Sequence, residues 1–242
     1  MPMHSVHGSS SPKVNNESIG HTVERLEPGF SRLLLSSVLV LLAGFIDSIG
    51  YLGLGKVYLS FMSGNSTKLG IALFEADYAL WATTGTVVLL FIAGAFVGTF
   101  ITESWGKWHL TLILSVECVL FIFAIMLSLL FHTQYIIFPI AMAMGMQNTM
   151  HQMVAHADVG KGFVSGTLFG IGQALAKAVR GKAPASEWAV LALSWFIFVI
   201  GAALGALILA YGGLFLSLLL AALLFLVLVI PYVVYMQRTK NG

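Results

Sequence analysis

The sequence predicts an all-α fold: a polytopic membrane helix bundle with six full-length spans and two short broken segments, built from two four-segment repeats. Composition gives two of the three observations that predict it. Hydrophobic residues make up 58% of the 242 residues and charged residues only 9%, whereas soluble domains average about 45–50% and about 25%. So few charges cannot cover a water-exposed surface, and lipid must be the main solvent.

The third observation is a set of eight apolar runs, six of which have 20 residues or more. A helix of that length crosses a hydrocarbon core of about 30 Å. The second and sixth runs are shorter and polar in the middle, and the second reads VYLSFM, SGNSTK, LGIALF. Because lipid cannot satisfy open backbone groups, we expect both to be broken, re-entrant or buried against protein. The runs lie at 33–54, 57–74, 82–102, 110–131, 135–154, 162–177, 188–210 and 213–236.

The segments outside the runs predict domain limits and orientation. Residues 1–32 are polar and without periodicity, which predicts a disordered cytoplasmic tail. The first membrane repeat is expected at 33–131, the second at 132–236, and a cytoplasmic end at 237–242. Lys and Arg divide ten to two between the membrane sides for six crossings, and eight to three for eight. Both counts place both termini in the cytoplasm and leave the number of crossings open.

Three blocks of sequence recur in the same order in the two halves. FMSGNSTKLGIAL (61–73) aligns on FVSGTLFGIGQAL (163–175), FIAGAFVGTFI (91–101) on FVIGAALGALI (198–208), and AGFIDS (43–48) on MGMQNT (144–149). The halves are inverted if the short segments do not cross the membrane, and parallel if they do. Both architectures occur in transporters, with the binding site near mid-membrane where broken helices meet. A purely structural duplication is the alternative.

The residues GFIDSIGYLGLGKVYLSFMSGNSTKLGIAL, and later GMQN with FVSGTLFGIGQAL, resemble the YoaK family of bacterial membrane proteins over about residues 33–236. That family has a Gly-x-x-Asp in the first helix, a Thr-Gly-Asn, and later a Gly-x-Gln-Asn and a Thr-Gly. Ser63 and Ser165 stand at the Thr positions and keep the hydroxyl. The resemblance implies a multi-span inner-membrane protein, a transporter by expectation, with no assigned substrate and no catalytic residues.

Asp47, inside the first long run, is the strongest single signal. A lipid-facing carboxylate costs about 2.5–3.5 kcal/mol on insertion scales, so we expect Asp47 to face the bundle interior. It then binds a proton or a solute, or else it is structural, through a hydrogen bond or an ion pair with Lys68. Asn148 takes the matching place in the second repeat and cannot titrate.

The polar residues of the broken segments are candidate solute ligands, because hydroxyls, amides and freed backbone groups bind polar solutes. The alternative is that they only hydrogen-bond one another between packed helices. Glu117, in the fourth run, joins Asp47 as a predicted proton-coupling residue, or else makes a local polar contact. The predicted substrate-binding residues are Asp47, Ser63, Gly64, Asn65, Thr67, Lys68, Gln147, Asn148, Ser165, Gly166, Thr167 and Gln173.

Two GxxxG motifs predict close helix crossings. They are Gly94 with Gly98 and Gly201 with Gly205, and they pack either within one chain or across a homodimer.

The remaining motifs bear on the class of function. HExxH, GxSxG and P-loop patterns are absent, so no enzyme, cofactor or metal is predicted. A net charge of +2 without a basic cluster predicts no nucleic-acid partner. The predicted partners are the lipid bilayer and an unidentified small polar solute, moved by a secondary transporter or channel that is proton-coupled through Asp47. The alternative is a non-transporting assembly or sensory protein, in which the polar groups only specify helix packing.

Overall fold

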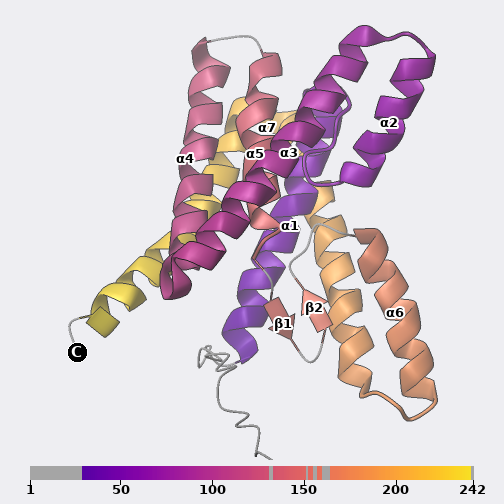
Figure 1. Ribbon diagram of the computed structural model, residues 1–242, viewed down its shortest axis with the longest axis vertical. Helices are drawn as coiled ribbons and strands as arrows, with labels where there is room; N and C mark the ends of the chain where they lie inside the picture. Colours follow the sequence, from indigo (N-terminus) through magenta and orange to yellow (C-terminus); the bar gives the residue numbers. More distant parts are fainter. Residues whose placement is uncertain (1–28, 131–132, 151, 155–156, 160–163, 241–242) are drawn as a thin grey trace, which may run out of the picture.

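The computed structural model describes residues 29–130, 133–150, 152–154, 157–159 and 164–240, and nearly all of them are helical (Figure 1). The predicted tail lies outside this set except for its last four residues, which begin the first helix. Strands β1 (Gln152–Val154) and β2 (Ala157–Val159) form one antiparallel pair, and η1 (Gly106–Trp108) and η2 (Thr133–Ile136) are 3-10 turns. The described residues form seven α-helices: α1 (Gly29–Gly53), α2 (Met62–Phe74), α3 (Tyr78–Ser104), α4 (His109–Leu130), α5 (Ile137–Gln147), α6 (Val164–Val179) and α7 (Ala185–Lys240).

Four helical stretches of the described residues are long and apolar enough to cross a membrane: Leu33–Gly53, Tyr78–Ser104, His109–Leu130 and Ala185–Leu228. The last has 44 residues and bends at Gly213, whose φ of 72° lies in the left-handed region that glycine adopts without strain. The seventh and eighth apolar runs therefore form the two arms of α7.

The fifth run differs from its prediction. Its helix α5 has only 11 residues, about 17 Å at 1.5 Å per residue, which is too short to cross the membrane as a helix. The reason lies at its C-terminal end, where Asn148 Nδ2 donates to Met144 O at 2.8 Å and Thr149 Oγ1 donates to Met146 O at 2.7 Å. Side chains that bond the last carbonyls favour turns over continued helix, so the prediction of six full-length helical spans is not met here.

The first arm of α7 crosses α1 with the two backbones in contact. A Cβ placed on Gly44 would overlap the carbonyl oxygen of Phe198, and one on Gly201 would overlap that of Leu41. A Cβ on Gly205 would likewise overlap the carbonyl oxygen of Phe45. Small residues are what allow such close crossings.

Helices α3 and α5 cross in the same way. A Cβ on Gly94 would overlap the carbonyl oxygen of Met142, and one on Gly145 would overlap that of Phe91. A Cβ on Gly98 would lie 3.1 Å from the Met146 Cα. All four glycines of the GxxxG motifs thus lie at helix crossings within the chain. These helix faces therefore do not form a homodimer contact, which was one of the two predictions.

The two crossings match each other, residue for residue, at the offsets of the sequence alignment. The contact of Gly44 with Phe198 corresponds to that of Gly145 with Phe91. The two glycines are 101 residues apart and the two phenylalanines 107, as in the aligned sequence blocks. The contact of Gly201 with Leu41 corresponds in the same way to that of Gly94 with Met142.

Helices α2 and α6, which form the second and sixth apolar runs, lie at opposite ends of the molecule. Figure 1 shows α2 in the upper half, where it packs on α3, and α6 in the lower half, where it packs on the first arm of α7. The start of α1 and the end of α7 both lie toward the lower end (Figure 1).

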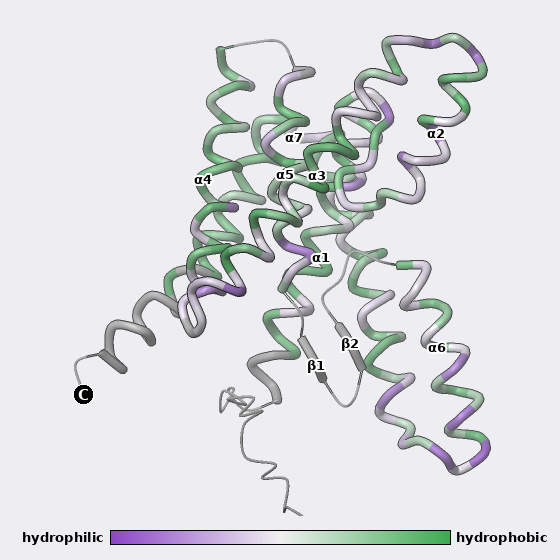
Figure 2. Tube along the Cα trace, viewed as in Figure 1, coloured by the Kyte–Doolittle hydropathy of each residue, from purple (hydrophilic) through white to green (hydrophobic). Residues whose placement is uncertain are grey.

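Hydrophobic residues run along most of the length of the long helices (Figure 2), and many of their side chains are exposed on the outside of the molecule. Phe96 of α3 is 71% exposed and Leu207 of α7 is 53% exposed, whereas Phe121 and Leu39 are fully buried. An outside of this composition is stable against hydrocarbon rather than water.

Candidate functional site

The carboxylate of Asp47 holds the loop 54–61 that joins α1 to α2. Asp47 is buried in α1, and its Oδ1 accepts hydrogen bonds from the backbone N–H groups of Leu59 at 2.7 Å and Ser60 at 2.6 Å. The Ser60 hydroxyl donates to Oδ2 at 2.8 Å. These donors are free because the loop is not helical, and hydrogen bonds to a carboxylate are about twice as strong as neutral ones. Asp47 therefore ties the entry of α2 to α1.

The loop lies directly on α1 because Gly50 leaves room for it. A Cβ on Gly50 would stand 2.6 Å from the carbonyl oxygen of Val57 and 3.0 Å from the Leu59 side chain. Asp47 of the Gly-x-x-Asp motif thus hydrogen-bonds the loop, and Gly50, three residues later, leaves the space that the loop occupies.

Asn65, in the first turn of α2, closes the same loop from the other side. It is fully buried, its Nδ2 donates to Tyr58 O at 2.6 Å, and its Oδ1 accepts from Tyr58 N at 2.9 Å. A Cβ on Gly64 would lie 2.6 Å from the Phe61 ring. In the sequence Ser-Gly-Asn, the glycine therefore leaves space for the Phe61 ring. The asparagine forms two hydrogen bonds with the Tyr58 backbone, and this pair of bonds is called the clamp below.

Lys68 does not pair with Asp47, which corrects one of the two structural alternatives. Its Nζ donates to the carbonyl oxygen of Lys56 and lies 4.4 Å from the ring centroid of Tyr51 and 4.7 Å from that of Tyr58. The two rings stack with centroids 5.2 Å apart. Burial lowers the pKa of the Lys68 ammonium, and the charge of Lys56 lowers it further. The pair with Asp47 is not formed because the loop already occupies both carboxylate oxygens.

Two predicted ligands of α2 point away from this cluster. Ser63 and Thr67 are exposed, and the Thr67 hydroxyl donates to the Ser63 carbonyl oxygen of its own helix at 3.1 Å. The structure therefore gathers Asp47, Gly64, Asn65 and Lys68 around the loop and leaves these two hydroxyls outside.

The polar residues of the second half also reach α1. Gln147, at the end of α5, is buried and donates through Nε2 to Leu39 O at 2.9 Å, while its Oε1 has no donor among the described residues. Leu39 and Asp47 are eight residues apart on α1, about 12 Å along the helix. Asn148 is half-buried beside Gln147.

The first turn of α6 lies close to α1 as well. Thr167 lines a small cavity together with Val40 of α1 and Ser194 of α7. Ser165 and Gln173 are exposed, and Gly166 is half-buried. Candidate residues from both halves of the chain thus lie on or against the same helix, α1.

Glu117 stands apart from this arrangement. It is fully buried in α4, which packs on α5 and α7, and neither carboxyl oxygen has a hydrogen-bond partner among the described residues.

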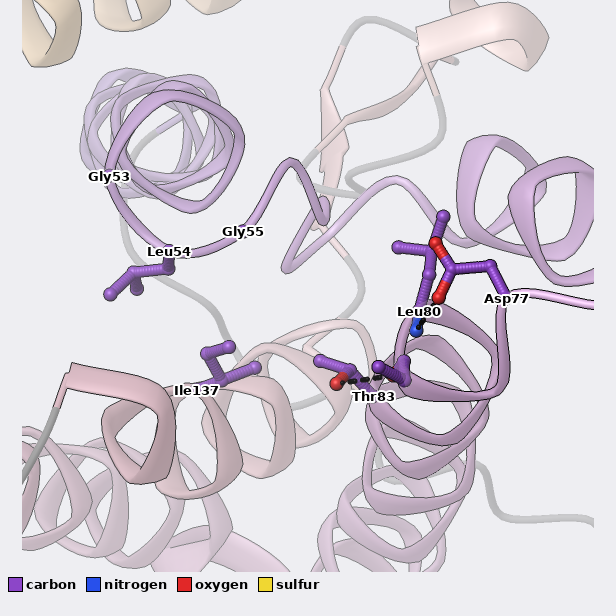
Figure 3. A pocket seen from close by; sticks show the side chains of 8 residues that line it. Gly53, Leu54, Gly55, Asp77, Leu80, Thr83 and Ile137 are labelled. Atoms are coloured by element: carbon purple, nitrogen blue, oxygen red, sulfur yellow. Dashed lines mark hydrogen bonds between the residues drawn. The ribbon is translucent and has the colours of Figure 1, made fainter. Parts of the chain in front are cut away.

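A cavity of about 300 Å³ lies where the end of α1 meets the starts of α3 and α5 (Figure 3). Its size is at the lower limit of ligand pockets. Asp77, on its wall, accepts a hydrogen bond from Leu80 N at 3.0 Å and caps α3. None of the predicted ligands lines this cavity, which is bounded by Gly53, Leu54, Gly55, Asp77, Ala79, Leu80, Thr83 and Ile137.

Sequence reasoning missed the partners that complete the cluster. Ser60 and Tyr58 sit in an apolar stretch with no motif of their own, and only the polar Ser between apolar neighbours in YLSFM marked the position. Asp77 had a clearer signal, because an Asp directly before a long apolar run is a typical helix N-cap.

A helical molecule with apolar side chains on its outside is an integral membrane protein. The chain belongs to a family described as "Protein of unknown function (DUF1275)", which matches residues 35–230. This match confirms the YoaK-family resemblance.

Two relatives are named as transmembrane proteins. The chain is 30% identical over 148 residues to "UPF0700 transmembrane protein YoaK" of Bacillus subtilis (strain 168), an alignment covering 57% of this chain and 64% of that relative's length. It is 26% identical over 184 residues to "UPF0700 transmembrane protein RA0705" of Rhizobium meliloti (strain 1021), covering 75% of this chain and 77% of the relative. No solved structure matches the chain.

Proposed function

We propose that the protein is a secondary transporter or channel for a small polar solute in a bacterial inner membrane, built from two inverted four-segment repeats. The observation that carries the proposal is the matched pair of helix crossings, α1 with α7 and α5 with α3, whose glycine contacts correspond at the alignment offsets. Corresponding tertiary contacts are what a duplicated unit produces. Inverted repeats with broken helices are a recurrent transporter architecture.

Six crossings with cytoplasmic termini fit this architecture. Helices α2 and α6 are short and lie at opposite ends (Figure 1), as two re-entrant segments entering from opposite sides would. The α5 helix is followed by the strand pair β1–β2 (Figure 1), and membrane proteins tolerate non-helical chain at membrane depth where it is buried in protein. The start of α1 and the end of α7 then share one side, in accord with the ten-to-two division of Lys and Arg.

In this proposal the Asp47 cluster is a proton-linked latch. An ionised Asp47 accepts from Leu59 and Ser60 and keeps the loop on α1. Protonation turns one oxygen from an acceptor into a donor and weakens these bonds. The loop and the entry of α2 are then released, which opens a path beside α1 for the solute. The scheme involves no covalent chemistry and no cofactor.

One observation favours a second candidate, a non-transporting assembly or sensory protein. The polar atoms of Asp47 and Asn65 are occupied by bonds within the chain. Such bonds specify helix packing without any solute. This alternative predicts that replacing Asp47 changes stability and no flux.

The deciding experiment is solute-triggered charge movement in liposomes. Pools of small polar metabolites are screened with the wild type and with Asp47→Asn, whose amide keeps the shape and one acceptor oxygen. We expect a signal in the wild type that Asp47→Asn abolishes or uncouples from protons. Asp77→Asn is the matched control, because asparagine also caps helices and should leave flux unchanged. Silence of folded wild-type protein across the pools would favour the assembly or sensory protein.

A further inference from the structure

We infer that Glu117 of α4 is a proton-binding site, whose carboxyl group carries its proton in the conformation described here and exchanges it with water in another. The side chain is fully buried by protein, so lipid and water are both excluded from it. Neither oxygen accepts a hydrogen bond from any described residue. A buried acceptor without a donor is rare in folded proteins and calls for a physical explanation.

The surroundings of Glu117 are apolar. Ile113, Leu114 and Phe121 occupy the positions one turn before and after it on α4, and all three are fully buried. The Phe121 ring lies 4.8 Å from that of Phe225 on the second arm of α7. An isolated ionised carboxylate is strongly disfavoured in such a medium, and the group neutralises instead.

No described charge compensates the carboxyl group. Helix α4 packs on α3, α5, α7, η1 and η2, and their ionisable residues lie near helix ends or turns. Cys118, next to Glu117 on α4, is a buried thiol. The side chains of Lys107 in η1 and of Tyr232, Tyr235, Arg238 and Lys240 in the last turns of α7 are outside the described set. The other ionisable residues of α4 and these elements, whose side chains are described, are Tyr78, Glu103, His109, Tyr135, Glu187 and Tyr211.

Asp47 and Glu117 thus have opposite environments. Asp47 receives three hydrogen bonds, whereas Glu117 receives none from the described residues. Hydrogen bonds to a carboxylate favour its ionised form, whereas burial without such bonds favours the neutral acid. A difference of this kind is how one fold provides both an anion and a neutral acid. The ionised Asp47 of the proposed latch and the protonated Glu117 therefore belong to the same conformation.

The shortest route for the proton leads to the lower end of the molecule. Glu117 is eight residues from the start of α4 at His109, about 12 Å along the helix. That end of α4 lies on the same side as the end of α7 (Figure 1). Separation of α4 from the second arm of α7 would bring water to the carboxyl group from this side.

Infrared spectroscopy of the protein in lipid tests the inference directly. A neutral carboxylic acid has a C=O stretching band that an ionised carboxylate lacks. We expect this band in the wild type at neutral pH, its loss in Glu117→Gln, and its shift when the sample is equilibrated in D2O. Glu103→Gln is the matched control: Glu103 is exposed near the end of α3, so the band should stay.

Two results would overturn the inference. Identical bands in the wild type and Glu117→Gln would mean that Glu117 is ionised. A band that never shifts in D2O would mean that the Glu117 carboxyl group never exchanges its proton with water and has only a structural role. Coupling of this proton to flux rests on the proposed function, whereas the infrared result needs no solute. If the band behaves as expected and no solute moves, the site stands and the transporter proposal fails.

Discussion

At the scale of single residues, the cluster around loop 54–61 depends on the chemistry of each atom. Asn65 presents an N–H donor to a carbonyl and a carbonyl oxygen to an N–H of the same residue, Tyr58. Apart from glutamine and a protonated carboxylic acid, no side chain carries a donor and an acceptor side by side in this way. Asn65 therefore acts as a structural clamp in this conformation, which was the alternative to a solute ligand, and its role as a ligand stays a prediction.

Asn65→Asp should destabilise the protein more than Asn65→Ala. The aspartate replaces the donor with an acceptor that faces the Tyr58 carbonyl, whereas the alanine only leaves two buried groups unpaired, at about 1–3 kcal/mol each. Thermal unfolding in detergent measures both. Ser66→Ala is the control, because this exposed hydroxyl bonds only its own helix. Equal midpoints for Asn65→Asp and the wild type would show that the clamp contributes nothing.

The predictions from the sequence differ in success for physical reasons that also lie at this scale. The interior position of Asp47 followed from the cost of a charge in lipid and is confirmed by its burial. Its partners could not be predicted, because loop 54–61 has no periodicity and its backbone donors are invisible in the sequence. The pairing with Lys68 was wrong for that reason.

At the scale of elements, hydropathy located the helices better than it located their ends. The run 135–154 is apolar throughout, yet α5 ends at Gln147, where Asn148 and Thr149 bond the last carbonyls. Likewise, a GxxxG motif predicts a close crossing but not its partner helix. The partners, α5 for Gly94 and α1 for Gly201, are set by the tertiary structure.

Gly201→Ala and Gly172→Ala should change stability in opposite directions. Alanine favours a helix over glycine by about 0.5–1 kcal/mol, and Gly172 of α6 has open space around it. At Gly201 the added methyl group meets the Leu41 carbonyl oxygen and forces α1 from α7. We expect a lower thermal midpoint for Gly201→Ala and an unchanged or higher one for Gly172→Ala. A stable Gly201→Ala would show that the crossing is loose.

At the scale of the whole molecule, the arrangement of α2 predicts where the turns of the chain lie. With α2 re-entrant, the turn after α3 returns to the side of the termini, and Lys56 and Lys107 face opposite sides. With α2 crossing, the two share one side. Single cysteines at these positions, with Cys118 replaced, are labelled in intact cells by a membrane-impermeant maleimide. We expect labelling at position 56, and at position 107 only after the membrane is opened. Labelling of both in intact cells would establish that α2 crosses the membrane, which leads to eight crossings and parallel repeats, and loop 54–61 would then join two spanning helices.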